Sequence, residues 1–256
     1  MPDKFFWYDV MTTDTGAARK FYGDVIGWSA QDQDSPTPGT QYTVFSANGR
    51  GVAGLMPIPA DARKAGVPPM WMGYIAVDDV DEAARRLERE GGKVHRPPTD
   101  VPGIIRFAVV ADPQGAGFII AKGLMREAPP EPPPGTPGTV GWHEIDAADG
   151  ESAFAFYERM FRWTKGEVMD MGPMGNYQLF ATGGANVGGM MTKPPAVPAP
   201  HWTYYFNVPA INAAVSRVTA GGGKIIYGPM QVPGDLWIVN GIDPQGAGFA
   251  LVAPKR

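Results

Sequence analysis

The sequence predicts an α+β protein built from two tandem copies of one domain, with four β-α-β-β-β units in all. The seven residues Asp112–Phe118 return unchanged at Asp243–Phe249. Within each heptapeptide, Asp, Pro and Gly stand where a type I turn prefers them, so the segment is expected to join two strands. The repeat covers nearly the whole chain. At an offset of 135 residues Trp7 aligns with Trp142, Tyr42 with Tyr177 and Trp28 with Trp163, and at an offset of 131 Trp71 aligns with Trp202 and Tyr74 with Tyr205.

The first unit of a copy is predicted to contain one strand, one helix and three strands. Asp14 is suited to cap the helix, because its side chain can accept hydrogen bonds from the first helical amides. Apolar residues then recur at helical spacing, and Asn48-Gly49 is a typical hairpin turn. The expected strands are residues 5–13, 28–31, 41–47 and 51–56, and the helix runs from Asp14 to Gly27 with Ala18, Phe21, Tyr22 and Val25 on its buried face.

The second unit repeats this order from Met70 to Lys122. Its helix is expected to be capped by Asp78 or Asp79 and to end at Gly91-Gly92. Residues 56–70, between the two units, are rich in Pro and Ala, and the second copy is four residues shorter there, which predicts a surface connection. The buried face of the helix is Val80, Ala83, Ala84 and Leu87, and the strands are residues 70–77, 93–95, 104–110 and 117–122.

Domain boundaries follow from the repeat. The first domain is expected over residues 1–124 and the second over residues 140–256. Residues 125–139 are mostly Pro, Glu, Gly and Thr, so they predict an exposed, semi-rigid linker.

Composition excludes several functional classes. The chain contains no cysteine, so disulfides, thiolate metal sites and cysteine nucleophiles are excluded. Its net charge is −4 with both signs interspersed, unlike the basic surface of a nucleic-acid-binding protein. No apolar run is long enough to span a bilayer and no signal-peptide pattern begins the chain. We therefore expect a cytoplasmic protein without nucleic-acid or membrane partners.

Two motifs occur in both copies. An Asp is followed seven residues later by Phe-Tyr, at Asp14 and again at Asp149, and an Asp-Pro-x-Gly turn precedes the last strand. Together with the element order, they resemble the vicinal oxygen chelate superfamily, which includes glyoxalase I, extradiol dioxygenases and the fosfomycin and bleomycin resistance proteins. Trp142-His143-Glu144 looks most like the tandem two-copy members. The resemblance implies cupped mixed sheets with helices outside, a ligand on the concave face, and a monomer that contains an internal pseudo-dimer.

The resemblance also implies where a divalent metal would bind. Its usual ligands are a His, Gln or Glu near the start of a unit's first strand and a Glu on the last strand. A metal site needs about three nitrogen or oxygen ligands, and none of the residues at these positions supplies one. We therefore expect no metal cofactor and no metal-site residues, with misaligned ligands as the alternative. The positions hold Trp7, Met72, Trp142, Thr203, Ile119 and Ala250, and a further position falls near Gly54 and Gly189.

The candidate ligand site follows from strand alternation, which turns every second side chain to the same face. Aromatic side chains with a few orienting polar groups are typical of a small-molecule pocket. The alternative is that the same side chains only fill a small curved sheet. The candidate binding residues are Trp7, Asp9, Tyr74, Trp142, Glu144, His201 and Tyr205.

The three histidines and Arg106 stand at positions with different expected roles. His95, beside Arg96-Pro97, is expected to be solvated, and His143 is expected to be hydrogen-bonded and semi-buried on the helix side of its strand. His201 is expected either to serve only at a strand end or to face Glu144 or Asp9 in the cup. Arg106, if it points inward, would pair with Asp9 or with an anionic ligand.

Two main function classes remain. A scaffold that binds other proteins is a third possibility. The first is a metal-independent, glyoxalase-like and bleomycin-resistance-like protein that binds a small aromatic or amphipathic molecule. The second is an enzyme, either a metal-dependent lyase or dioxygenase, or a metal-free enzyme with Glu144, Asp9 or His201 as general base. The polar groups at Glu144, His143 and His201 make the second copy the favoured site.

Overall fold

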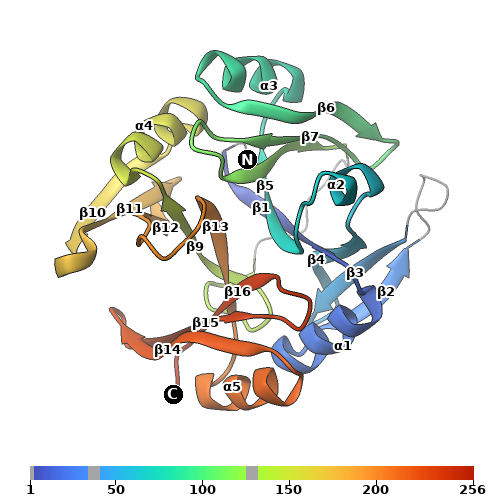
Figure 1. Ribbon diagram of the computed structural model, residues 1–256, viewed down its shortest axis with the longest axis vertical. Coiled ribbons are helices and arrows are strands. Elements are labelled where there is room, and N and C mark those ends of the chain that lie inside the picture. Colours follow the sequence, from blue (N-terminus) through green and yellow to red (C-terminus); the bar gives the residue numbers. More distant parts are fainter. Residues whose placement is uncertain (1–2, 34–40, 125–131) are drawn as a thin grey trace. The chain divides into compact units, whose positions relative to one another are not determined.

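The computed structural model describes residues 3–33, 41–124 and 132–256 and confirms the predicted α+β class (Figure 1). The strands belong to two eight-stranded mixed sheets, one formed by each copy of the repeat. In the first copy the elements are β1 Phe5–Thr12, α1 Thr15–Ile26, β2 Ser29–Gln33, β3 Tyr42–Ala47, β4 Arg50–Pro57, α2 Ala60–Lys64, β5 Met70–Ala76, α3 Val80–Arg89, β6 Lys93–Val101, β7 Ile105–Ala111 and β8 Gly117–Gly123. In the second copy they are β9 Val140–Ala147, α4 Gly150–Phe161, β10 Thr164–Asp170, the 3-10 turn η1 Gly172–Met174, β11 Asn176–Thr182, β12 Ala185–Thr192, β13 His201–Asn207, α5 Ile211–Ala220, β14 Lys224–Val232, β15 Leu236–Ile242 and β16 Gly248–Ala253.

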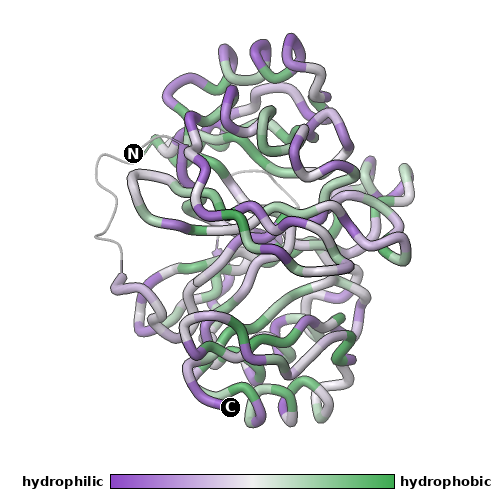
Figure 2. The backbone as a smooth tube through the Cα atoms, turned by 90° about the vertical axis from the view of Figure 1, so that its left-hand side faces the viewer, coloured by the Kyte–Doolittle hydropathy of each residue, from purple (hydrophilic) through white to green (hydrophobic). Residues whose placement is uncertain are grey.

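The helix caps are as the sequence predicts. Asp14 accepts a 2.9 Å hydrogen bond from the amide of Ala17, and Gly27 ends α1 in the left-handed conformation. Asp79, rather than Asp78, caps α3 by accepting from the amide of Glu82. On α3 Val80, Ala84 and Leu87 are buried, and the hydrophilic residues between them colour much of the helix at the top of Figure 2 purple.

Two elements differ from the expectation. β6 extends to Val101 although Pro97 and Pro98 lie within it. β6 is the last strand in its sheet order, and its register shifts between Arg96 and Thr99, so the missing proline N–H groups do not interrupt a central ladder. The short helix α2, Ala60–Lys64, lies in the predicted surface connection. It has no buried residue, so its sequence lacks the apolar periodicity that would predict a helix.

The repeated Asp-Pro-Gln-Gly segment forms the predicted tight turn. The amide of Gly115 donates to the carbonyl of Asp112 at 3.0 Å. The Asp112 carboxylate accepts from the amides of Gln114 and Ala116, and Asp243 accepts from Gln245 and Ala247 in the same way. In both copies the aspartate therefore closes the turn with its own side chain.

Each compact unit of the structure combines halves of the two copies. Within the described residues, unit 1 contains residues 3–6, 72–124 and 142–203, and unit 2 contains residues 7–33, 41–71, 132–141 and 204–256. Residues 125–131 of the predicted linker lie outside the described part of the chain. Its last residues pack within unit 2, where Trp28 donates to the carbonyl of Gly138 at 2.8 Å.

Unit 1 has a core of aromatic rings between α4 and its strands. Tyr157 on α4 stacks on Trp163 and meets Trp202 edge-on. Its hydroxyl donates to Asp112 at 3.0 Å and accepts from the Trp202 indole at 3.0 Å. Since Asp112 belongs to the first copy and Tyr157 to the second, the two family motifs bind each other across the repeat.

Unit 2 contains the same arrangement with the copies exchanged. Tyr22 on α1 donates to Asp243 at 2.9 Å and accepts from the Trp71 indole at 2.9 Å. Helix α5 packs beside α1, and Arg217 on α5 donates to the carbonyl of Val25 near the end of α1. Burial and the negative charge of Asp243 raise the pKa of Tyr22 well above its usual range, so its hydroxyl keeps its proton.

Among the described helices, none is both long enough and apolar enough to cross a bilayer.

Candidate functional site

In unit 1, a hydrogen-bonded aromatic cluster lies on β9 and β11. The Trp142 indole donates to the hydroxyl of Tyr177 at 2.8 Å, and this hydroxyl donates to Glu144 at 2.8 Å. Trp142 and Glu144 are half-buried, whereas the alternating residues His143 and Ile145 are buried. We call Trp142, Glu144 and Tyr177 the Trp142 triad. It presents an indole and a carboxylate on the sheet face opposite the Trp163 and Phe180 rings.

Unit 2 holds the equivalent cluster, the Trp7 triad, formed by Trp7, Asp9 and Tyr42. Here the indole donates to both the Asp9 carboxylate and the Tyr42 hydroxyl at 2.9 Å, and the hydroxyl donates to Asp9 at 2.8 Å. Asp9 is only 3% exposed, so this triad is more closed than the Trp142 triad. Burial and the Asp9 charge raise the pKa of Tyr42 well above its usual range, which keeps the hydroxyl a donor to the carboxylate.

A glycine on the neighbouring strand makes room for each triad. Gly54 is the register partner of Asp9, and Gly189 is the register partner of Glu144. A Cβ at Gly54 would lie 2.1 Å from both the Asp9 carboxylate and the Tyr42 hydroxyl, and one at Gly189 would lie 2.1 Å from the Tyr177 ring. The tyrosines therefore occupy the space into which a side chain at these positions would project.

His201 lies at the start of β13, where it approaches Asp146 of β9. Its Nε2 is 3.8 Å from the carboxylate of Asp146, and its Nδ1 is 3.1 Å from the carbonyl of Ala199. Asp146 stands two residues after Glu144 on β9, so His201 approaches the strand face that carries Glu144. Burial raises the pKa of Asp146, while His201 and Lys193 oppose that rise.

His143 has the buried, hydrogen-bonded position that strand alternation predicts. Its Nδ1 lies 2.8 Å from the carbonyl of Val187, and its ring stacks on Phe5 with centroids 4.4 Å apart. Burial lowers the pKa of His143 to about 4 despite the Val187 carbonyl. His143 is therefore neutral at physiological pH and belongs to the packed side of β9.

The two tyrosines predicted on the second units lie on β5 and β13. Tyr205 is 3% exposed and aligns with Ala250, and its hydroxyl accepts from the Asn240 amide at 3.4 Å. Tyr74 is 8% exposed and meets Phe6 edge-on. Both side chains are more buried than Trp142, which favours a packing role for much of their surface.

Arg106 lies on β7 and His95 on β6. Arg106 donates to Asp81 at 2.8 and 2.9 Å and to Asp100 at 2.9 Å, so its guanidinium is bound by two carboxylates of unit 1. Those two carboxylates raise the pKa of Arg106 above its usual range. His95 is exposed on β6, as expected for a solvated residue.

Comparison with known proteins decides the family. The model of the Glyoxalase/Bleomycin resistance protein/Dioxygenase superfamily matches residues 4–120. A Mycobacterium tuberculosis protein named "Putative glyoxylase CFP32" is 35% identical over 258 residues, covering 97% of this chain and 94% of the relative. The chain belongs to this superfamily. The anthracycline biosynthesis protein DnrV of Streptomyces peucetius is also similar, at 32% identity over 96% of this chain and 91% of its own length.

Solved structures in the glyoxalase superfamily share the fold. The Mn(II)-bound glyoxalase from Novosphingobium aromaticivorans superposes with a TM-score of 0.66 at 16% identity, covering 100% of this chain and 83% of that one. The 2,2',3-trihydroxybiphenyl 1,2-dioxygenase from Sphingomonas wittichii strain RW1 superposes with a TM-score of 0.64 at 13% identity, covering 96% and 88%. At these identities the likeness concerns the arrangement of the strands and helices.

The metal that many glyoxalase-superfamily enzymes bind can be tested against the residues present. Met72, Ile119 and Ala250 offer no nitrogen or oxygen donor in their side chains. At Gly54 and Gly189 a ligating side chain would collide with Tyr42 or Tyr177. Among the described residues, no three His, Asp or Glu side chains lie close enough to hold a metal ion. The residues at these positions therefore do not fit the metal.

Sequence reasoning missed two kinds of residue in the site. Tyr42 and Tyr177 were recognised only as positions of the repeat, although they link each indole to its carboxylate. Asp146 shares the strand face of Glu144, but nothing in the sequence indicated that it approaches His201. The recurrence of a tyrosine and an acid at matching positions in both copies was the available indication for the triads.

Proposed function

We propose that the protein binds a small, planar aromatic or amphipathic molecule without a metal, on the sheet face that carries the Trp142 triad. One observation carries this proposal. Tyr177 takes the space beside Gly189 and ties Trp142 to Glu144, so an aromatic surface with a polar edge stands at a position where metal enzymes of the superfamily have a ligand.

The chemistry of the Trp142 triad suits such a ligand. Indole rings stack on planar aromatic molecules, with about 0.5 to 1.5 kcal/mol per aromatic pair beyond the burial of apolar area. Trp142 is held through its N–H, so its ring loses little further freedom on binding. Glu144 supplies an acceptor for a phenol or amide N–H of the ligand. Trp7 and Trp142 are both half-buried, but Glu144 is half-buried where Asp9 is buried, and this accessible carboxylate favours the Trp142 triad.

The relatives narrow the ligand class within this proposal. DnrV and DauV of Streptomyces are named anthracycline biosynthesis proteins and are 32% and 31% identical to this chain over 96% of it. Anthracyclines contain fused aromatic rings. A polyhydroxylated, fused-ring aromatic is therefore the ligand class we propose, bound with its ring plane against Trp142 and a hydroxyl toward Glu144.

A second candidate function rests on Asp146 and His201. The Asp146 carboxylate lies 3.8 Å from the His201 imidazole, and burial raises the pKa of Asp146; a carboxylate perturbed in this way is a candidate functional group. On this alternative the protein is a metal-free enzyme that uses His201 as general base on a ligand held by Trp142. Chemical change of a bound hydroxyanthraquinone that is lost in His201→Gln, with binding kept, would favour it.

The experiment is calorimetric titration of the full chain with 1,4-dihydroxyanthraquinone, a small fused-ring phenol. Trp142→Leu should weaken binding about tenfold, which corresponds to losing stacking near the upper end of its range. Trp7→Leu is the matched control, since it changes the same residue in the closed triad, and it should leave the affinity unchanged. Equal weakening by both variants, or by neither, would contradict the assignment to the second copy.

A further inference from the structure

A groove lies between helices α1 and α5 of unit 2, which Figure 1 shows side by side. Its volume is about 560 Å³, within the range of roughly 300 to 1,000 Å³ that is typical of small-molecule sites. No residue of its lining belongs to either triad. We call it the α1–α5 groove, and six of its lining residues are Ala17, Lys20, Phe21, Asp24, Arg217 and Gly221.

The floor of the α1–α5 groove is apolar. Phe21 of α1 is buried, and its ring lies against two glycines that follow α5. A Cβ at Gly221 would lie 3.0 Å from this ring, and a Cβ at Gly223 would lie 2.8 Å from it. Because both positions lack a side chain, nothing from the end of α5 covers the floor.

In unit 1 an ion pair bridges the equivalent helices, α4 and α3. Arg159 of α4 donates to the Glu90 carboxylate at the end of α3 at 2.6 Å. At the offsets of the repeat, Arg159 corresponds to Asp24, and Glu90 corresponds to Gly221. Asp24 instead pairs with Lys20 of its own helix at 2.6 Å, so no ion pair crosses the α1–α5 groove.

A second bridge of unit 1 has no equivalent in unit 2. Gln114 of the Asp-Pro-Gln-Gly turn donates to the hydroxyl of Ser152 on α4 at 2.9 Å. Its counterpart Gln245 has Ala17 in place of that serine, and the buried Oε1 of Gln245 has no hydrogen-bond partner among the described residues. The repeat therefore keeps both bridges in unit 1, whereas unit 2 has small side chains at the same positions.

Arg217 is the cation of the α1–α5 groove that no carboxylate neutralises. It donates from Nε and Nη2 to the carbonyl of Val25, at 3.2 and 3.0 Å, and forms no ion pair within the described part of the chain. Lys20 and Asp24 neutralise each other. The formal charge of the lining is therefore the charge of Arg217, whose Nη1 takes part in neither bond.

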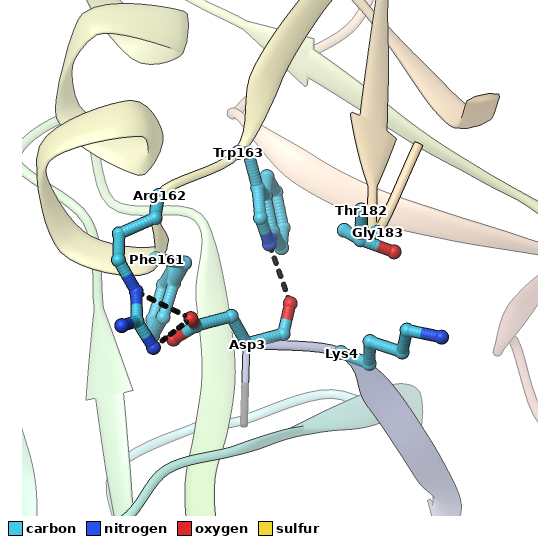
Figure 3. A pocket seen from close by; sticks show the side chains of 7 residues that line it. All are labelled: Asp3, Lys4, Phe161, Arg162, Trp163, Thr182 and Gly183. Atoms are coloured by element: carbon cyan, nitrogen blue, oxygen red, sulfur yellow. Dashed lines mark hydrogen bonds and ion pairs between the residues drawn. The ribbon is translucent and has the colours of Figure 1, made fainter. Parts of the chain in front are cut away.

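A smaller pocket of unit 1, drawn in Figure 3, does not offer the same combination. Its volume is about 140 Å³. The guanidinium of Arg162 there donates to the Asp3 carboxylate at 2.8 Å, so this cation is already paired. Size and charge both favour the α1–α5 groove as a ligand site.

We propose that the α1–α5 groove is a second ligand site, which binds a small carboxylic acid with an apolar body. The apolar body lies on the floor between the two helices, and the carboxylate pairs with Arg217. A guanidinium suits a carboxylate because it presents several N–H donors in one plane. This site does not depend on the aromatic ligand proposed for the Trp142 triad.

The test is a titration of the isotope-labelled full chain with benzoate and with benzyl alcohol, followed by amide chemical shifts at neutral pH and constant ionic strength. The two probes share a phenyl ring and differ in charge. We expect saturable shifts at Phe21 and Gly221 with benzoate, and an affinity about fivefold higher than that of benzyl alcohol, as for a partly exposed ion pair. Shifts that do not saturate with benzoate, or equal affinities for the two probes, would overturn the proposal.

A double variant closes the groove with the residues of the other copy. Asp24→Arg/Gly221→Glu places the Arg159–Glu90 ion pair between α1 and α5. Gly221 has a φ of −79°, close to the −84° of Glu90, so a glutamate suits the backbone there. The variant should lose the saturable shifts while the rest of the amide spectrum is kept. Unchanged benzoate binding in a folded double variant would contradict the site.

Two single variants test the role of the cation. Arg217→Gln removes the charge but keeps an amide that can donate to the carbonyl of Val25, and it should weaken benzoate binding about fivefold without changing the affinity for benzyl alcohol. Arg86→Gln is the matched control, because Arg86 is the counterpart of Arg217 and donates to the carbonyl of Arg159 in unit 1. It should leave both affinities unchanged. Equal weakening by the two variants would overturn the assignment to the α1–α5 groove.

Discussion

The hydroxyl of Tyr22 donates a 2.9 Å hydrogen bond to Asp243, which lies 221 residues later in the chain. Tyr157 and Asp112 form the equivalent bond at 3.0 Å. The helix tyrosine and the turn aspartate are the two motifs that resemble the superfamily, so in this chain the motifs bind each other, and each bond joins one copy to the other. Their role is structural, and they leave the opposite sheet face to the triads.

Removal of one of these hydroxyls should destabilise the protein. Tyr22→Phe removes the hydrogen bond to Oδ2 of the buried Asp243 carboxylate and the acceptor of the Trp71 indole, which costs about 1 to 3 kcal/mol of unfolding free energy. Chemical denaturation would measure the loss. Tyr157→Phe serves as the matched comparison and should cost a similar amount, since its partners are equivalent. A loss in one variant only would contradict the equivalence of the two networks.

The glycines under the triads should not tolerate a methyl group. Gly189→Ala brings a Cβ within 2.1 Å of the Tyr177 ring, so we expect a loss of about 1 to 3 kcal/mol from overpacking. Gly123→Ala is the control, because nothing lies within 4 Å of a Cβ there, and it should change stability by less than about 0.5 kcal/mol. If Tyr177 is the cause, Gly189→Ala should cost much less in a Tyr177→Ala background.

His143 should make the protein sensitive to acid. Its folded pKa of about 4 lies below the unfolded value near 6.5, so the unfolded state binds a proton first as pH falls. Its contribution is present above pH 6.5 and is lost as pH falls toward 4, by roughly 3 kcal/mol in all. Unfolding curves between pH 7 and pH 4 would show this slope, and His143→Gln should remove most of it. An NMR titration of His143 near pH 6.5 would contradict the prediction.

The two Tyr–Asp hydrogen bonds between the copies support the expectation that the protein is a monomer. Both Tyr22–Asp243 and Tyr157–Asp112 are completed by residues of one chain. A single-copy relative would need a second chain to complete such bonds. We therefore expect the full chain to sediment as a monomer of 27.4 kDa at micromolar concentration, and an obligate dimer would count against this.

The fold could be predicted from the sequence because the local signals for its helices, strands and turns occur at matching positions in both copies. The positions of Asp14, Gly27 and the Asp-Pro-Gln-Gly turn depend on local chemistry, which a single segment contains. The partners of Arg106 and His201 depend instead on which strands meet. Asp81 lies 25 residues before Arg106, and Asp146 lies on another strand from His201, so neither pairing followed from alternation alone.

The same limit applies to the metal positions. The sequence showed that Gly54 and Gly189 cannot coordinate a metal, but it did not show what fills the space beside them. Tyr42 and Tyr177 lie on the adjacent strand and reach over the glycines to Asp9 and Glu144. These side chains meet only because of the strand register. The sequence alone therefore could not predict the triads.

The most direct measurement of the central claim is the affinity for 1,4-dihydroxyanthraquinone before and after dialysis against EDTA, in the wild type and in Trp142→Leu. We predict one binding site per chain whose affinity EDTA leaves unchanged and Trp142→Leu lowers about tenfold. Binding that disappears with EDTA and returns with a divalent metal, or that is indifferent to Trp142, would contradict a metal-free aromatic site on the Trp142 triad.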